Sequence, residues 1–427
     1  MDHLNSQRAL AYFDDLFPLD PPPMATQLQS VPARHDIIAD VLSFTAFGAA
    51  TITEQRGGIP YFINEFWTAG QRQAHSIHEV SYRACFKAQL PEFFIARLTE
   101  VGDSVYDPFM GRGTTPVQAA LQGRRPLGND INPLSKLLVR PRLEPPALID
   151  VANALESIPW DRPVEVRDDL TVFYHPETLR RLTNLRDFLL ESAPLNEEAP
   201  DPVLDWIRMV AINRLTGHSP GFFSVYTLPP NQAVSIDAQR KINAKRSQSP
   251  EARDIARIII KKSKSLLSDG QMPQHPSCKL LTGVSTASLS LAEGEVDLVV
   301  TSPPFLDIVQ YAQDNWLRCW FAGIDVDAVN IAMHRTEASW TTMVRDTLIE
   351  QARVVRPGGH IAFEVGEVRN GKVLLERLVW QAAEGLPFER LGVMVNQQDF
   401  TKTSNCWGVS NNRSGTNTNR IVLLKRL

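Results

Sequence analysis

The chain has 427 residues, of which 43% are hydrophobic and 22% charged, and its formal net charge is −4. This composition is typical of a globular protein of two or three structural units. The negative net charge excludes a uniformly basic surface, so any contact with nucleic acid must come from a local patch.

Several classes of protein are not indicated by the sequence. No run of 18 apolar residues predicts a membrane span, and residues 1–5 lack the charged-then-apolar order of a signal peptide. The four cysteines form no Cys-x-x-Cys pair, which argues against a disulfide framework and a zinc site. We therefore expect a reduced, cytoplasmic protein without a metal or a membrane partner.

Residues 1–65 are interpreted as an N-terminal extension without a readable motif. The triple proline at 21–23 is expected to be extended, and residues 9–17 before it to form a short helix.

Residues 66–145 predict half of a doubly wound α/β sheet. A glycine-rich segment, 107–115, separates an expected strand from an expected helix that begins near a proline. The predicted elements are a helix over 88–98, a strand over 104–106, a helix over 116–121 and a strand over 125–129.

Residues 146–275 do not continue this alternation of strands and helices, and they are interpreted as a helical insertion. Helical patterns dominate, as in 176–190 and 202–215. Alternating strands and helices are predicted again over 276–427. The continuous apolar run at 296–300 is typical of a buried parallel strand. Further helices are predicted over 342–354 and 374–383, and strands over 360–365, 390–395 and 420–425. The sequence thus predicts a doubly wound, Rossmann-like sheet with a helical insertion between its two halves.

The segment 107–115 reads Asp-Pro-Phe-Met-Gly-Arg-Gly-Thr-Thr. Glycines after a strand let the backbone approach a ligand closely, and the next helix offers free N–H groups. Pro116 stands where the dinucleotide fingerprint has its third glycine, which argues against a pyrophosphate ligand. Asp130 ends the next strand, where a carboxylate can accept hydrogen bonds from both ribose hydroxyls. The alternatives are a tight strand–helix turn and a turn or cap role for the aspartate.

A second motif, Thr301-Ser302-Pro303-Pro304-Phe305, follows the buried strand at 296–300. Two prolines make the loop rigid and remove two N–H donors, which leaves carbonyl groups pointing outward. Such a loop suits recognition of an amino group, and the aromatic residue can stack on a planar ring. A plain strand terminator is the alternative.

Together these motifs resemble the amino-group DNA methyltransferase family, over roughly 70–140 and 280–427. The resemblance implies S-adenosylmethionine as the cofactor, with its methionine part in the glycine loop and its ribose on Asp130. The segment 78–91 resembles the element that precedes the glycine loop in this family. Where the family often has an acid after the glycine that precedes the motif strand, as in Gly-Asp-Ser, this chain reads Gly283-Val284-Ser285, so Ser285 or a neighbour would have to substitute for the acid. The implied cofactor-binding residues are Phe86, Asp107, Pro108, Phe109, Gly111, Gly113, Thr114, Thr115, Asp130 and Ser285.

The resemblance also implies that Ser302 and the Pro303 carbonyl hold the target amine and that Phe305 stacks on a flipped base. The implied catalytic residues are Ser302, Pro303, Pro304 and Phe305. A serine before the two prolines favours cytosine N4 over adenine N6 in this family. We therefore expect a site-specific, duplex-DNA cytosine-N4 methyltransferase. The alternatives are an adenine-N6 DNA methyltransferase, an RNA amino-methyltransferase and a DNA-binding protein that does not catalyse.

In this family an insertion such as 146–275 usually holds the target-recognition region. Residues 240–264 contain nine basic side chains opposed by Glu251 and Asp254, and the loop at 218–232 offers polar and aromatic contacts. A second candidate is the polar loop 401–419, since long loops are often functional. A solvated helix face and a plain surface loop are the alternatives. The predicted DNA-binding residues are Arg240, Lys241, Lys245, Arg246, Lys261, Lys262, Lys402 and Arg413. A separate restriction endonuclease fits the resemblance as a partner, although no nuclease or helicase motif is found in the chain.

Overall fold

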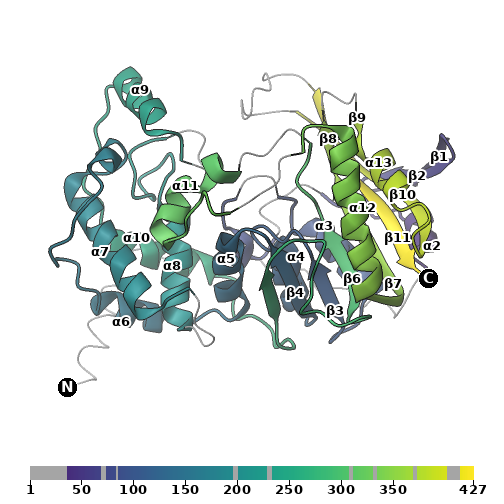
Figure 1. Ribbon diagram of the computed structural model, residues 1–427, viewed down its shortest axis with the longest axis horizontal. Coiled ribbons are helices and arrows are strands. Elements are labelled where there is room, and N and C mark those ends of the chain that lie inside the picture. The colour runs from purple at the N-terminus through teal and green to yellow at the C-terminus, as the bar shows by residue number, and fades with distance from the viewer. Residues whose placement is uncertain are drawn as a thin grey trace.

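A central sheet organises the chain (Figure 1). The computed structural model describes residues 36–68, 74–82, 85–195, 201–227, 233–306, 311–329, 334–368, 373–401 and 414–427. Within them, a 9-stranded sheet has the order β1-β2-β10-β11-β7-β6-β3-β4-β5. Its strands are β1 (Ile52–Arg56), β2 (Ile59–Asn64), β3 (Ser104–Asp107), β4 (Arg125–Asp130), β5 (Lys279–Thr282), β6 (Val296–Thr301), β7 (Val355–Val365), β10 (Phe388–Thr401) and β11 (Ser414–Arg426). Strands β8 (Glu367–Val368) and β9 (Val373–Leu374) form a separate small sheet.

The strand order explains where a ligand can bind. Strands β7, β6, β3, β4 and β5 run parallel, whereas β11 is antiparallel to both of its neighbours. From β3 the chain builds outward through β4 to β5, and from β6 it builds in the opposite direction through β7. In open α/β sheets, ligands bind at the carboxyl ends of the strands where the order reverses. Both motifs follow these ends, and the predicted α/β class is confirmed.

The strands of the sheet centre are buried on both faces. Leu298 and Val300 of β6 pack with α3, while Val299 between them packs on the opposite face with residues of α12. This alternation follows from the period of two along a strand, and burial of both faces explains the continuous apolar sequence. The helices beside the sheet are α2 (Ile37–Leu42), α3 (Gln89–Leu98), α4 (Thr114–Leu121), α5 (Pro133–Leu143), α12 (Glu337–Val354) and α13 (Leu375–Ala382).

A lobe of helices lies beside the sheet (Figure 1). Helix α11 follows the Ser-Pro-Pro-Phe loop in the sequence, yet it packs on α7 and α8 of the lobe, so the chain crosses from sheet to lobe directly after this loop. No helix in the described ranges combines the length and apolar character needed to span a membrane. The helices of the lobe are α6 (Leu148–Glu156), α7 (Pro176–Ser192), α8 (Pro202–Arg214), α9 (Ile236–Arg246), α10 (Ile255–Leu266) and α11 (Tyr311–Ala322), with the 3-10 turns η2 (Ser76–His78) and η3 (Asp168–Val172).

Two sequence expectations change at the sheet edge. Residues 52–64, assigned to an extension, form β1 and β2, and β2 pairs in parallel with β10. The loop expected over 401–419 is shorter, because β10 continues to Thr401 and pairs with Ser414, where β11 begins. Backbone pairing extends this hairpin beyond its apolar residues, so hydrophobic alternation could not reveal its length. The helix expected over 9–17 lies outside the described residues.

Candidate functional site

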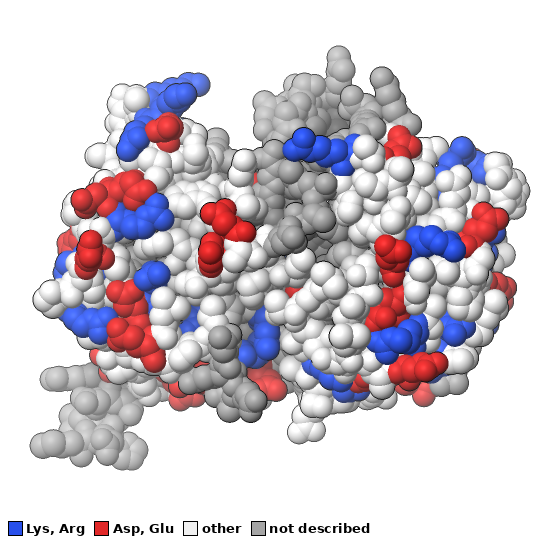
Figure 2. Space-filling model, viewed as in Figure 1, with Lys and Arg blue, Asp and Glu red and all other residues white. Residues whose placement is uncertain are grey.

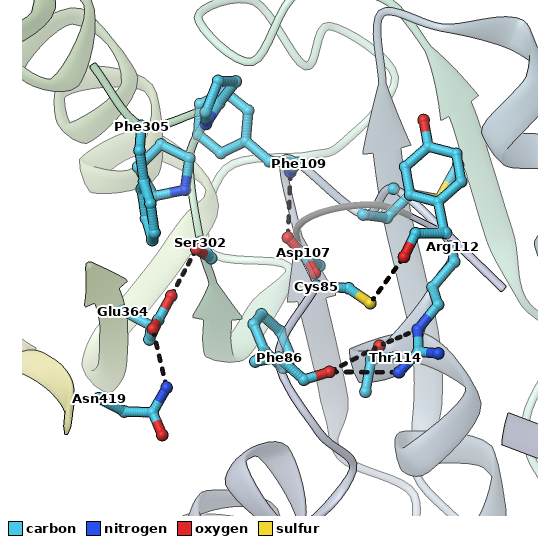
Figure 3. Close-up of a pocket in the computed structure, with 15 residues that line it drawn as sticks. Cys85, Phe86, Asp107, Phe109, Arg112, Thr114, Ser302, Phe305, Glu364 and Asn419 are labelled. Atoms are coloured by element: carbon cyan, nitrogen blue, oxygen red, sulfur yellow. Dashed lines mark hydrogen bonds between the residues drawn. The ribbon is translucent and has the colours of Figure 1, made fainter. Parts of the chain in front are cut away.

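A pocket opens at the carboxyl ends of β3, β6 and β7 (Figure 3). It joins the glycine loop to the Ser-Pro-Pro-Phe loop, and the structure thereby brings all the predicted catalytic residues together with Phe86, Asp107, Phe109, Gly111 and Thr114. The lining residues are Tyr82, Cys85, Phe86, Asp107, Phe109, Met110, Gly111, Arg112, Thr114, Ser302, Pro303, Pro304, Phe305, Glu364 and Asn419.

The glycine loop takes its shape from two glycines with left-handed backbone conformations. Gly111 has φ +49° and Gly113, which precedes α4, has φ +77°. A Cβ atom at Gly113 would also lie 2.3 Å from a methyl group of Val139. Gly113 therefore lets the loop turn and lets α4 pack closely, without itself lining the pocket.

Asp130 fixes the glycine loop from the end of β4. Its Oδ2 accepts the Gly111 N–H at 2.8 Å and its Oδ1 accepts the Asn132 N–H at 2.9 Å. Burial raises the pKa of this carboxyl. Because each carboxylate oxygen has a second lone pair, Asp130 can accept a further hydrogen bond, and its predicted contact with ribose stays a prediction.

Asp107 is the buried acid of the pocket, with an exposed fraction of 1%. Its Oδ1 accepts hydrogen bonds from the Thr301 hydroxyl at 2.6 Å and from the Phe109 N–H at 3.0 Å. Burial raises the pKa of Asp107 to about 7. The ionised form places a negative charge in a site of low polarity, which suits a ligand that carries positive charge.

Other predicted cofactor residues make their contacts with neighbouring elements rather than in the pocket. The Thr115 hydroxyl donates to the Val300 carbonyl at 2.9 Å, which joins α4 to β6. The Ser285 hydroxyl is hydrogen-bonded to that of Thr347 on α12 at 3.0 Å, so it faces the helix. Among the described residues, the predicted cofactor residues that do not line the pocket are Pro108, Gly113, Thr115, Asp130 and Ser285.

Arg112, which the sequence analysis missed, ties the glycine loop to the segment before α3. Its guanidinium donates to the carbonyls of Val80 at 2.9 Å and Phe86 at 3.3 Å. These bonds hold Phe86 at the pocket (Figure 3). The hydrogen-bond partners of Arg112 include backbone carbonyls, which leave no charge pattern in the sequence.

Ser302 is paired with a buried acid that the sequence analysis also missed. Its hydroxyl donates to Glu364 Oε2 at 2.5 Å, and the Asn419 amide donates to Glu364 Oε1 at 3.0 Å (Figure 3). Glu364 is 5% exposed, and burial raises its pKa. Since the Ser302 proton is directed to Glu364, the Ser302 oxygen keeps its lone pairs for another donor. The signal for Glu364 was a charged residue inside the expected strand 360–365.

The predicted DNA-binding residues fall into separate groups. Helix α9 carries four of them, all exposed, at the tip of the helical lobe (Figures 1 and 2): Arg240, Lys241, Lys245 and Arg246. Lys261 and Lys262 lie on α10. Lys262 Nζ is 3.0 Å from Glu79 Oε2 and its side chain is 11% exposed, so it serves a contact within the protein. Lys402 and Arg413 lie outside the described residues.

Comparison with known proteins agrees with the motifs. The N6/N4 DNA methylase family model matches residues 53–137. Two curated relatives align over short segments. The Type II methyltransferase M.MjaII of Methanocaldococcus jannaschii is 41% identical over 73 residues, which are 17% of this chain and 13% of that protein. The Type II methyltransferase M.MvaI of Kocuria varians is 32% identical over 110 residues, 25% of this chain and 23% of that protein. The chain thus aligns with less than a quarter of either relative.

Solved structures show weaker likeness. TrmN from Thermus thermophilus gives a TM-score of 0.31 at 10% identity, covering 82% of this chain and 52% of that protein. A TehB-like SAM-dependent methyltransferase from Corynebacterium glutamicum gives a TM-score of 0.29 at 9% identity, covering 81% of this chain and 90% of that protein. The assignment to a family therefore depends on the sequence matches. They confirm the resemblance that the motifs predicted: residues 53–137 match the N6/N4 DNA methylase family, and this family supports S-adenosylmethionine as the cofactor.

Proposed function

We propose that the protein transfers a methyl group from S-adenosylmethionine to the exocyclic amine of cytosine, N4, at a specific site in duplex DNA. The observation that carries the proposal is a single pocket with a buried acid and a glycine loop on one side and the Ser302–Glu364 pair on the other. Bound S-adenosylmethionine supplies an activated methyl group. Asp107, Phe86 and Phe109 would hold it, since a buried carboxylate and aromatic faces both attract cationic groups.

The catalytic loop is suited to an amine that is a poor nucleophile. The lone pair of an exocyclic amine is conjugated with the base ring. Ser302 Oγ and the Pro303 carbonyl would each accept one N–H of the amine, which directs the nitrogen lone pair towards the cofactor side of the pocket.

The Ser302–Glu364 pair can also accept the proton that the target amine releases. When the N–C bond forms and the bond between the methyl group and the cofactor's sulfur breaks, the nitrogen must release one proton. Ser302 Oγ would accept it while the Ser302 proton passes to Glu364 Oε2, 2.5 Å away. The raised pKa makes Glu364 a stronger base than an exposed glutamate. No covalent bond to the enzyme is needed.

Duplex DNA requires a cationic surface, and we assign this role to α9. The helix is largely polar: its one buried residue is Gln239, and the half-buried Ile236 packs against the core of the lobe. Amide hydrogen bonds anchor it: Gln239 and Gln248 donate to the Tyr226 carbonyl at 3.0 and 2.9 Å, and Asn243 donates to the Val172 carbonyl at 2.7 Å. A helix held in this way contributes little apolar burial but presents four cations against one acid, Asp237, which suits contact with phosphates.

The α9 assignment is tested by the salt dependence of DNA binding. Each phosphate contact contributes a slope of about −0.9 to the plot of log affinity against log salt, so Lys241→Gln with Lys245→Gln should flatten it by about two such contacts. The matched control is Arg162→Gln with Arg167→Gln. It removes two exposed arginines of the same lobe whose charges Glu191 and Asp169 balance. Equal slopes in both double variants would overturn the assignment.

The methyl transfer itself is tested with labelled S-adenosylmethionine and mixed-sequence duplex DNA. We expect the wild-type protein to label the DNA, and Ser302→Ala to bind the cofactor and the DNA without labelling it. Label confined to RNA would favour an RNA amino-methyltransferase. Binding without any transfer by the wild type would favour a DNA-binding protein that does not catalyse.

A further inference from the structure

We infer that Trp340 and Gly366 are positioning residues that fix the Pro304–Phe305 end of the catalytic loop, so that the Pro303 carbonyl is the one presented to the target amine beside Ser302. This inference rests on the proposed function, which gives the loop its role. Neither residue belongs to a motif of the sequence, and both act from elements outside the loop.

Trp340 holds the loop through the backbone carbonyl of Pro304. Its indole N–H donates to the Pro304 carbonyl at 2.8 Å, and its side chain is fully buried in α12. It packs in the same cluster as Leu306 and Val344, so the indole cannot move without disturbing the core. The two prolines have no N–H groups, so a hydrogen bond can hold their backbone only through a carbonyl. The bond to Trp340 engages the Pro304 carbonyl and leaves that of Pro303 for the substrate.

Gly366 holds the loop through the aromatic ring of Phe305. A Cβ atom at this position would lie 2.5 Å from Phe305 Cε2 and 3.1 Å from Cζ, so the ring rests directly on the backbone that follows β7. Gly366 does not have a left-handed φ. Close approach, rather than backbone conformation, is thus what demands glycine here.

The contacts together hold the loop at successive residues. Ser302 is bound to Glu364, Pro304 to Trp340, and Phe305 rests on Gly366. Two of these supports come from β7 and the segment directly after it, and the third comes from α12. A displacement of about 1 Å in reacting groups can lower a rate by about 100-fold, so this support controls catalysis more than it controls cofactor binding.

The test compares two variants with two matched controls. Trp340→Phe removes the indole donor, and Trp380→Phe is its control, since Trp380 is a half-buried residue of α13. Gly366→Ala inserts a methyl group against Phe305. Its control is Gly283→Ala, whose Cβ would have Asn129 Oδ1 as its nearest neighbour, at 3.7 Å. We expect kcat to fall about 10- to 100-fold in Trp340→Phe and Gly366→Ala, with KM for S-adenosylmethionine within about twofold of wild type. Both controls should keep the wild-type kcat.

Other results would overturn the inference. Unchanged kcat in both variants would mean that the loop needs neither support. An equal loss of cofactor affinity, or a fall in kcat that only follows loss of folded protein in thermal melts, would mean a general structural role. If the wild type transfers no methyl group, the proposed function fails. The support of the loop by Trp340 and Gly366 is then tested by NMR. The indole N–H signal of Trp340, assigned by its loss in Trp340→Phe, should shift in Gly366→Ala and stay in place in Gly283→Ala. An unshifted signal in Gly366→Ala would contradict the coupling.

Discussion

The Ser302 hydroxyl lies 2.5 Å from Glu364 Oε2, and the register of two parallel strands produces this contact. Thr301 of β6 pairs with Phe363 of β7, so the next residue on each strand meets its counterpart at the carboxyl edge of the sheet. A slip of one residue would turn the glutamate to the other face. The central sheet therefore builds the Ser302–Glu364 pair directly.

Replacing Ser302 tests its role as an acceptor for the target amine. In Ser302→Ala the amine loses one of its two acceptors and the path to Glu364. We expect kcat to fall about 100- to 1,000-fold, with cofactor affinity within about twofold, measured by single-turnover methylation and calorimetry. Ser290→Ala, at an exposed serine outside the pocket lining, is the control and should be fully active. A wild-type rate in Ser302→Ala would remove the serine from the mechanism.

Glu364→Gln tests the proton path through the pH profile. The carboxylate form is needed to take up a proton, so activity should be lost as pH falls through the pKa of Glu364. Burial raises this pKa, which places the acid limb of the kcat profile above the usual glutamate range. The glutamine variant should have a low kcat without that limb between about pH 5 and 9. An unaltered limb in the variant would assign it to another group.

Asp107→Asn should separate stability from cofactor binding. Burial raises the pKa of Asp107 to about 7 from its ordinary 3.8, so the folded state binds this proton more tightly than the unfolded state. Its contribution to stability is present below the unfolded pKa and is lost as pH rises through about 7. Asparagine is neutral and its oxygen can accept the same two hydrogen bonds.

We therefore expect Asp107→Asn to unfold at a higher temperature than wild type at about pH 8 and to lose that advantage towards about pH 5. Its affinity for S-adenosylmethionine should be lower at both values. Thermal unfolding and calorimetry at the two pH values check this. A pH-independent difference in stability would contradict the buried, titrating carboxyl.

The glycine loop is tested by comparing two glycines with positive φ. Gly113 (φ +77°) would place a Cβ atom 2.3 Å from Val139, whereas Gly102 (φ +92°) has no atom within 4 Å of the added Cβ. Both alanine variants suffer backbone strain of about 1 kcal/mol. Only Gly113→Ala should also shift the loop, lowering cofactor affinity and the unfolding temperature further than Gly102→Ala does. Equal effects on both quantities would mean that close packing at Gly113 is unimportant.

The parts of the fold that could be predicted from the sequence are those that depend on local sequence patterns. The apolar run of β6, the glycine loop after β3 and the proline pair at 303–304 each depend on neighbouring residues. Their meeting in one pocket followed from the rule that carboxyl ends of parallel strands share an edge. The residues of both motifs that line the pocket were named from the resemblance to the methyltransferase family, and their cofactor and catalytic roles stay predictions.

The missed residues depend on contacts between distant parts of the chain. Glu364 is 62 positions from Ser302 and 55 from Asn419, and Trp340 reaches Pro304 from another helix. No local pattern encodes such pairs. Lys262 was grouped with α9 by charge alone, but the face of α10 that carries it turns to Glu79.

The base that receives the methyl group can be identified by nucleoside mass spectrometry of mixed-sequence duplex DNA, and of RNA, after incubation with the protein and isotopically labelled S-adenosylmethionine. We expect labelled N4-methylcytosine in the DNA, formed about 100- to 1,000-fold more slowly with Ser302→Ala. Labelled N6-methyladenine instead would keep an amino-group methyltransferase and overturn the choice of base. Label in RNA alone, or in neither nucleic acid, would contradict the account.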